Sequence, residues 1–294
     1  MPVTPTLITK LSGGAGDQIA AMAATATEIA FIGTIESTTA SELISAPALG
    51  GSDGFISSIT PAGAHLWDLR LGGAGDEIAT AIVRDKVGSF WIVGSSTKPQ
   101  LPVATSAIDT QSVNIDGIAV VPISTPTNAL TQLTVWKVSL TGSLLATYSC
   151  DASGLVAPDS ISFDGTNFII NGTLEDQRFS TKISQSGEFA KLSILSILSK
   201  TSSKAPAVPA IQILKAGTGS VKSFISKGAI AGIPSWKPKS AIPVLIEYNK
   251  AKAITRASYF QGKVIAVTWQ SGVGPIVITE RSDGYGISIL GFTK

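Results

Sequence analysis

The stretch LGGAGDEIATAI, from Leu71 to Ile82, decides the fold of this 294-residue chain because the chain contains it more than once. The stretch SGGAGDQIAAMA (Ser12–Ala23) carries the same Gly-Gly-Ala-Gly-Asp sequence 59 residues earlier, and an apolar segment follows both copies. A third, degenerate copy is DSIS (Asp159–Ser162). Repetition at such a spacing indicates one supersecondary unit that is built several times.

Further strand signatures recur after these copies. A second strand ends in FIGT (Phe31–Thr34), IVGS (Ile92–Ser95) and INGT (Ile170–Thr173). An Asp-Gly pair opens an apolar run in SDGFISSI (Ser52–Ile59), IDGIAVV (Ile115–Val121) and SDGYGISIL (Ser282–Leu290). A fourth strand, HLWDLRL (His65–Leu71), leads into the next Gly-Gly pair. Four strands per unit without helical periodicity predict an all-β fold made of β-propeller blades.

The spacing of the innermost strands predicts five blades of four antiparallel strands in one domain, residues 1–294. These strands are expected to start near residues 18, 77, 159, 209 and 262. The last unit ends after its third strand, so the N-terminal TLITKLS (Thr6–Ser12) is expected to supply the fourth strand and close the ring. In the second unit, either Asp116–Ile123 or Leu133–Leu140 is the third strand, and the other belongs to an insertion.

The segment LRLGGAGDEIATAIVRDKVGSFWIVGSST (Leu69–Thr97) resembles a bacterial β-propeller repeat whose blades start with Gly-Gly-x-Gly-Asp. The resemblance is good over residues 11–97 and extends less closely to about residue 195. This family occurs in exported and surface proteins. The resemblance therefore implies a propeller and export, and it implies no catalytic residues because the repeat is a scaffold.

Two roles are open for the Gly-Gly-Ala-Gly-Asp loop. In the structural role, its glycines allow a tight turn with positive φ between blades, and its aspartate accepts hydrogen bonds from backbone N–H groups. In the functional role, Asp17, Asp76 and Asp159 form part of a ring that binds a cation. Ca²⁺ is the cofactor that such a set of oxygen ligands would suit, and no other cofactor is expected.

Composition narrows the chemistry that the chain can perform. Only 14% of the residues are charged, and this low charge is typical of an extracellular β-rich protein. One cysteine, Cys150, precludes an intramolecular disulfide, and it is expected to be a small apolar residue at a strand end. One histidine, His65, excludes a His-rich zinc site and is expected on an outer strand. The chain has no Walker motif, and its GGAG lacks the helix of a dinucleotide loop.

The sequence contains no export or membrane signal of its own. No apolar run approaches the ~18 residues of a membrane span, and Met1 leads directly into sequence of folded character. We expect a mature form from which an export signal was removed, and the alternative is a cytoplasmic protein that starts at Met1.

Charge is distributed very unevenly along the chain. Residues 1–177 hold 6 Lys or Arg and 16 Asp or Glu, a net charge of −10. Residues 178–263 hold 14 Lys or Arg and 2 Asp or Glu, a net charge of +12. Because consecutive blades are neighbours in a ring, we expect an acidic side and a basic side. The alternatives are a passively solvated surface, attraction to an anionic polymer, and contact between the opposite sides of two copies.

The basic half contains the candidate binding residues Trp236, Lys237, Lys239 and Lys222. Trp236 lies in the Pro-rich stretch IAGIPSWKPKSAIP (Ile230–Pro243). An exposed indole between lysines can stack on a sugar or on another planar group. The alternative is an indole that fixes its own loop to the blade.

The sequence favours an exported, non-enzymatic binding or surface-assembly module. Its expected partners are a glycan, an anionic surface polymer or a second copy of the chain. Nucleic acid is not expected, because aromatic residues are not interleaved with the lysines. The alternative is a propeller glycoside hydrolase that uses central carboxylates, with Asp17, Asp76 and Asp159 as candidates.

Overall fold

Strands form all the regular structure of the described chain. The computed structural model describes residues 5–14, 16–36, 41–98, 113–115, 118–120, 129–197, 212–215, 219–230, 233, 236, 238–270 and 273–290. Within these ranges there are 22 β-strands and no helix. Twenty of the strands form five four-stranded antiparallel sheets, and the other two form a small hairpin.

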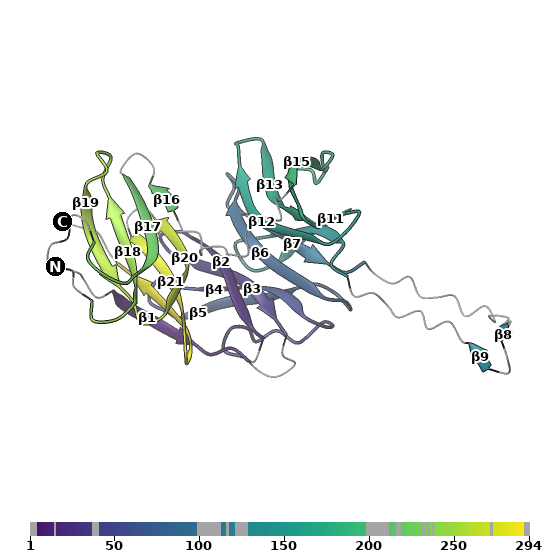
Figure 1. Cartoon of the computed structure of the whole chain (residues 1–294), viewed down its shortest axis with the longest axis horizontal. Coiled ribbons are helices and arrows are strands. Elements are labelled where there is room, and N and C mark those ends of the chain that lie inside the picture. Colours follow the sequence, from purple (N-terminus) through teal and green to yellow (C-terminus); the bar gives the residue numbers. More distant parts are fainter. Residues whose placement is uncertain are drawn as a thin grey trace.

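The five sheets are the predicted propeller blades (Figure 1). Blade 1 contains β2 (Gln18–Ala24), β3 (Ile29–Ile35), β4 (Asp53–Ile59) and β5 (His65–Leu71). Blade 2 contains β6 (Glu77–Arg84), β7 (Phe90–Ser96), β10 (Gln132–Val138) and β11 (Leu144–Asp151). Blade 3 contains β12 (Val156–Phe163), β13 (Asn167–Leu174), β14 (Gln177–Ser184) and β15 (Ser193–Ile197). Blade 4 contains β16 (Gln212–Lys215), β17 (Gly219–Ser226), β18 (Ile242–Tyr248) and β19 (Ile254–Tyr259).

Blade 5 combines both ends of the chain. It contains β20 (Lys263–Gln270), β21 (Gly274–Arg281), β22 (Gly284–Ile289) and β1 (Thr6–Leu11). The pairing of β1 with β22 is antiparallel and sets Thr6 opposite Ile289 and Leu11 opposite Tyr285. The prediction that the N-terminal strand completes the last blade is therefore confirmed, but the five described sheets are not joined by hydrogen bonds into the closed ring that was expected.

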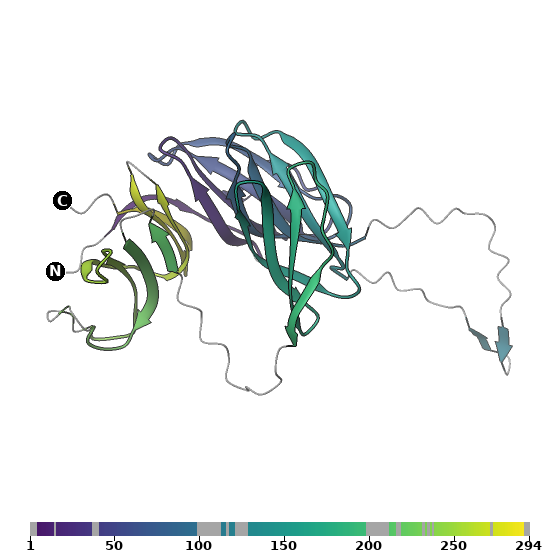
Figure 2. The ribbon, with the colours of Figure 1, turned by 90° about the horizontal axis from the view of Figure 1, so that it is seen from above.

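The structure resolves the two alternatives for blade 2. Its third strand is β10, which overlaps the predicted Leu133–Leu140 segment, and β10 pairs with both β7 and β11. The Asp116–Ile123 segment lies in the insertion, which contains the hairpin of β8 (Val113–Ile115) and β9 (Ile118–Val120). This hairpin lies apart from the five sheets (Figures 1 and 2).

Buried apolar clusters join neighbouring blades. One cluster contains Phe31 of blade 1 and Ile278 of blade 5, and another contains Ile56 of blade 1 and Trp136 of blade 2. Blades 2 and 3 share a third cluster, and blades 4 and 5 share a fourth. Strands β3 and β7 lie between two neighbouring sheets, so almost every residue in them is buried and neither shows the alternation of a strand with one wet face.

The ring is open between blades 3 and 4. In the described part of the chain no buried cluster joins these two blades, and they stand apart in both overall views (Figures 1 and 2). Phe168 and Ile170 of β13 pack in the cluster shared with blade 2. The intervening Ile169 and Asn171 point to the opposite face, because side chains alternate along a strand. On the next strand, Ser180 pairs with Asn171, so polar residues contribute to this uncovered face of blade 3.

The glycine of FIGT, IVGS and INGT is explained by a bulge. Three inner strands contain a register shift opposite Gly33, Gly94 and Gly172, respectively. A Cβ atom at each glycine would clash with a carbonyl oxygen of the inner strand and with an aromatic ring on the other side. Close backbone approach at a bulge is therefore the reason for glycine in this motif.

We predict that deleting residues 1–11 lowers the melting temperature by roughly 5–10 °C. Ile8 and Leu11 pack on the cluster of blades 1 and 5, and losing these partly buried side chains costs about 3 kcal/mol in all. Thermal unfolding followed by circular dichroism tests this. Lys10→Gln is the control, because it removes only the exposed ion pair with Asp283. An unchanged melting curve for the deletion would show that β1 does not complete the blade in solution.

Candidate functional site

The first Gly-Gly-Ala-Gly-Asp loop has the hydrogen bonds expected of a structural joint. The side chain of Asp17 is buried, and its Oδ2 accepts a hydrogen bond from the N–H of Gly14 at 2.7 Å. Its Oδ1 accepts from the N–H of Glu36, which directly follows β3, at 3.1 Å. Gly16 has a φ of 88°, a conformation that L side chains rarely adopt. The loop therefore has the turn geometry and the carboxylate acceptor that the structural role predicts.

The second copy connects blade 1 to blade 2. Asp76 Oδ1 accepts hydrogen bonds from the N–H of Ser52 at 2.9 Å and from its hydroxyl at 3.2 Å. The N–H of Asp76 donates to Thr97 Oγ1. In this copy the N–H of Gly73 donates to Glu77 Oε2 at 3.1 Å. Glu77, the residue after Asp76, therefore accepts the bond that Asp17 accepts from Gly14 in the first copy. Burial raises the pKa of the Glu77 carboxyl.

The structure corrects the third copy of the repeat. Asp159 lies inside β12 at the bulge between Pro158 and Ser160, where it corresponds to Thr80 of blade 2 rather than to Asp76. Its side chain is half exposed and pairs with Arg178. The joint of blade 3 is made instead by Leu155, whose N–H donates to Glu175 Oε1 and whose carbonyl accepts from the Glu175 N–H.

The three aspartates that were candidates for a metal ring have separate protein partners. Asp17 binds backbone amides, Asp76 binds Ser52, and Asp159 binds Arg178. Over the described ranges there is no group of three or more His, Cys, Asp or Glu side chains placed to bind a metal ion. The calcium ring and the glycosidase carboxylates remain predictions.

Trp236 lies in the arrangement of an indole that fixes its own loop. It is only 5% exposed, and its Nε1–H donates to Ser226 Oγ at 3.0 Å. Its ring packs at a tilt against Tyr259, with 6.4 Å between centroids. In this position the indole is not presented for stacking on a ligand.

The candidate lysines have different surroundings. Lys222 is half-buried on β17, Lys239 is exposed before β18, and Lys237 lies outside the described residues. The segment that forms blade 4, residues 212–259, contains eight Lys or Arg and one acidic residue, Glu247. Glu247 is 1% exposed and forms an ion pair with Arg256. The exposed charges that the structure describes on blade 4 are therefore all positive.

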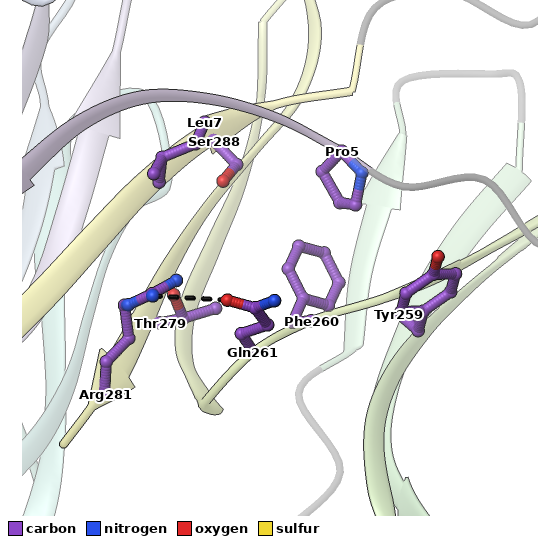
Figure 3. A pocket seen from close by; sticks show the side chains of 8 residues that line it. All are labelled: Pro5, Leu7, Tyr259, Phe260, Gln261, Thr279, Arg281 and Ser288. Carbon is purple, nitrogen blue, oxygen red and sulfur yellow. Dashed lines mark hydrogen bonds between the residues drawn. The ribbon is translucent and has the colours of Figure 1, made fainter. Parts of the chain in front are cut away.

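A hollow that the sequence does not predict lies at the seam of blades 4 and 5 (Figure 3). Its volume is about 240 Å³. Blade 4 contributes Tyr259 and, just beyond β19, Phe260 and Gln261, while Pro5, Leu7, Thr279, Arg281 and Ser288 line the blade 5 side. Positions 5 and 288 meet only through the pairing of β1 with β22, so local sequence contains no signal for this hollow.

A charged group borders the hollow. Arg281 Nε–H donates to Asp283 Oδ1 at 3.0 Å, and Lys10 Nζ donates to Asp283 Oδ2 at 2.7 Å. These two bonds, the one from Lys10 foremost, lower the pKa of the Asp283 carboxyl to about 2. The two cations and one carboxylate carry a net charge of +1.

The two residues that could suggest nucleophilic chemistry lie on different blades. His65 on β5 is exposed and lies 3.0 Å from Asp68, whereas Cys150 is half-buried on β11. Burial raises the pKa of the Cys150 thiol, which disfavours the thiolate. In the described part of the chain no helix has the length and apolarity needed to cross a bilayer.

Comparison with known proteins gives only distant structural similarity. No protein-family model and no curated protein sequence matches the chain. The chain is similar to Myxococcus xanthus glutaminyl cyclase at a TM-score of 0.41 and 8% identity, with all of both chains covered. It is similar to the Dos1 propeller at a TM-score of 0.32 and 9% identity, and the match covers 100% of this chain and 76% of the Dos1 chain. It is also similar to Drosophila Plexin A in complex with Semaphorin 1b, at a TM-score of 0.35 and 7% identity. This match covers 98% of this chain and 54% of the other chain. The propeller assignment therefore rests on the strand pairing of this chain.

We predict that Asp17→Ala and Asp76→Ala each reduce the free energy of unfolding by roughly 1–2 kcal/mol, because each leaves backbone N–H donors without an acceptor. Urea unfolding measures this loss. Asp159→Ala is the matched control and should cost about 0–1 kcal/mol, as expected for an exposed pair.

Calcium titration of the same proteins tests the metal ring. A large calcium-dependent rise in melting temperature that Asp17→Ala and Asp76→Ala abolish would overturn the structural role in favour of a cation site.

Proposed function

We propose that this chain is an exported, non-enzymatic binding module that uses blade 4 to hold an acidic polysaccharide. The observation that carries the proposal is the charge of blade 4. Its single carboxylate, Glu247, is buried with Arg256, so the seven lysines of the segment have no acidic neighbour within the blade to offset them. A surface of one sign attracts a partner of the opposite sign and accelerates its binding.

The placement of the described lysines suits an extended partner. Lys227 and Lys239 lie in the connection between β17 and β18, and Lys250 and Lys252 lie in the turn between β18 and β19. One group precedes β18 and the other follows it, so the two groups lie at opposite ends of the blade. Lys222 lies between them on β17. A strand of this length spans ~20 Å, so the lysines form a track rather than a compact anion pocket.

Several described carboxylates of the acidic half accept hydrogen bonds from backbone N–H groups within the fold. Asp85 accepts hydrogen bonds from the N–H groups of Val87 and Ser89, and Asp68 accepts from those of Ser45 and Ala46. Such side chains hold turns and loops by satisfying backbone donors. These carboxylates therefore need no partner to explain them, and this favours a separate polyanion over contact between two copies.

We predict that charge reversal of Lys222, Lys237 and Lys239 to Glu weakens binding to polygalacturonate roughly 100-fold at low salt. Each lost contact is worth about 1 kcal/mol in water. Wild-type binding should also weaken steeply toward physiological ionic strength, where the Debye length is about 8 Å. Titration of the labelled polymer, followed by fluorescence anisotropy, measures both effects.

The matched control reverses three lysines outside blade 4, Lys86, Lys98 and Lys137, and should leave the affinity within a few-fold of wild type. Sedimentation without polymer provides the second readout. Concentration-dependent oligomers that the blade 4 reversals abolish would assign the lysines to self-association. A wild-type monomer that binds no polyanion at low salt would overturn the proposal.

A further inference from the structure

The hollow at the seam of blades 4 and 5 has an apolar wall and a polar wall. Leu7 of β1 and Phe260, just after β19, contribute apolar surface, and Figure 3 shows Phe260 and Pro5 facing the same space. Thr279 and Ser288 contribute hydroxyls from two adjacent strands of blade 5. A cyclic ligand with one C–H face and one hydroxylated edge matches this division.

Arg281 is fixed at the edge of the hollow. Its Nε–H binds Asp283, and an N–H of Nη2 binds Gln261 Oε1 at 3.3 Å, the contact drawn in Figure 3. These bonds use two of the five N–H groups of the guanidinium, and nothing else in the described structure accepts from it. Because Gln261 Oε1 faces Arg281, the Gln261 amide group can donate to a ligand. A planar guanidinium beside an amide donor is well suited to bind a carboxylate.

The absence of a side chain at Gly286 lets three residues that line the hollow pack directly against the backbone of β22. A Cβ atom at Gly286 would lie 3.0 Å from Thr279 Oγ1 and 3.1 Å from both Arg281 Cδ and Leu7 Cδ1. All three neighbours line the hollow. An alanine at position 286 would therefore push these three side chains away from the strand and toward the hollow, which would narrow the site.

Size and continuity favour one ring of a longer chain. The volume of about 240 Å³ is below the ~300–1,000 Å³ of pockets for drug-sized ligands. A second hollow of about 380 Å³ adjoins it and shares Gln261 and Arg281. A polymer bound through one ring can therefore continue past Arg281. The net charge of +1 on Lys10, Arg281 and Asp283 favours an anionic ring over a neutral one.

We propose that this hollow binds a single uronic acid residue, with the pyranose face on Leu7 and Phe260, and the carboxylate on Arg281 and Gln261. This inference rests on the proposed function, since it names the acidic sugar that the blade 4 lysines would help to retain. It places recognition of the sugar at the seam and long-range attraction on blade 4.

Methyl β-glucuronide and methyl β-glucoside are the probes, because they differ only in the carboxylate. Binding is measured by ligand-observed NMR titration. We expect a dissociation constant of ~1 mM for the glucuronide, which is typical of a ligand of this size, and at least fivefold weaker binding of the glucoside. Arg281→Gln should abolish this preference, and Gly286→Ala should weaken both probes. Lys263→Gln, an exposed cation of blade 5 outside the hollow, should change neither.

Three results would contradict the proposal that the hollow binds a uronic acid residue. Absence of saturable glucuronide binding, equal affinity for the two probes, or binding that neither Arg281→Gln nor Gly286→Ala changes would overturn the proposal. Melting curves establish that both variants fold. Polygalacturonate binding that depends on the blade 4 lysines, without glucuronide binding, would reject the hollow alone. Glucuronide binding without polymer binding would reject the role of blade 4 alone.

Discussion

A four-stranded sheet with two apolar faces must be covered on both sides, and this need organises the whole molecule. Strands β3 and β7 are buried along nearly their whole length because neighbouring blades cover each face. The loops follow from the same need. The connections from blade 5 to blade 1 and from blade 1 to blade 2 are short, and Asp17 and Asp76 satisfy backbone donors that these connections would otherwise leave unpaired. The ring opens at blade 3, where the exposed face already includes polar residues such as Asn171.

The role of a residue was predictable from the sequence where the local backbone requires one residue type, such as glycine at a close approach or aspartate as an acceptor for backbone N–H groups. Gly33 and Asp17 are such cases, and both recur at the predicted spacing. The third copy differs from the prediction for a physical reason: Leu155 stands in place of the aspartate, and Glu175, in the turn after β13, supplies the carboxylate. Asp159 resembles the motif in sequence only.

Tertiary packing explains what the sequence did not predict. The burial of Trp236 depends on Ser226, ten residues earlier in the chain and without any periodic relation to it. The seam hollow depends on Leu7 lying beside Ser288 and on Phe260 approaching from another blade. The charge imbalance was evident from composition, but the distinction between carboxylates that hold turns and lysines on an open blade required the structure.

The pairing of β1 with β22 also orders the events of folding. The residues made first, such as Thr6, pair with residues made nearly last, such as Ile289. At ~5–20 residues per second, synthesis separates the two strands by roughly 15–60 s. Blades 1–4 each come from a single stretch of chain, whereas blade 5 must wait for the whole of it. During that interval β1 lacks its native partner, so the edge that it pairs with β22 stays exposed until the last blade has been made.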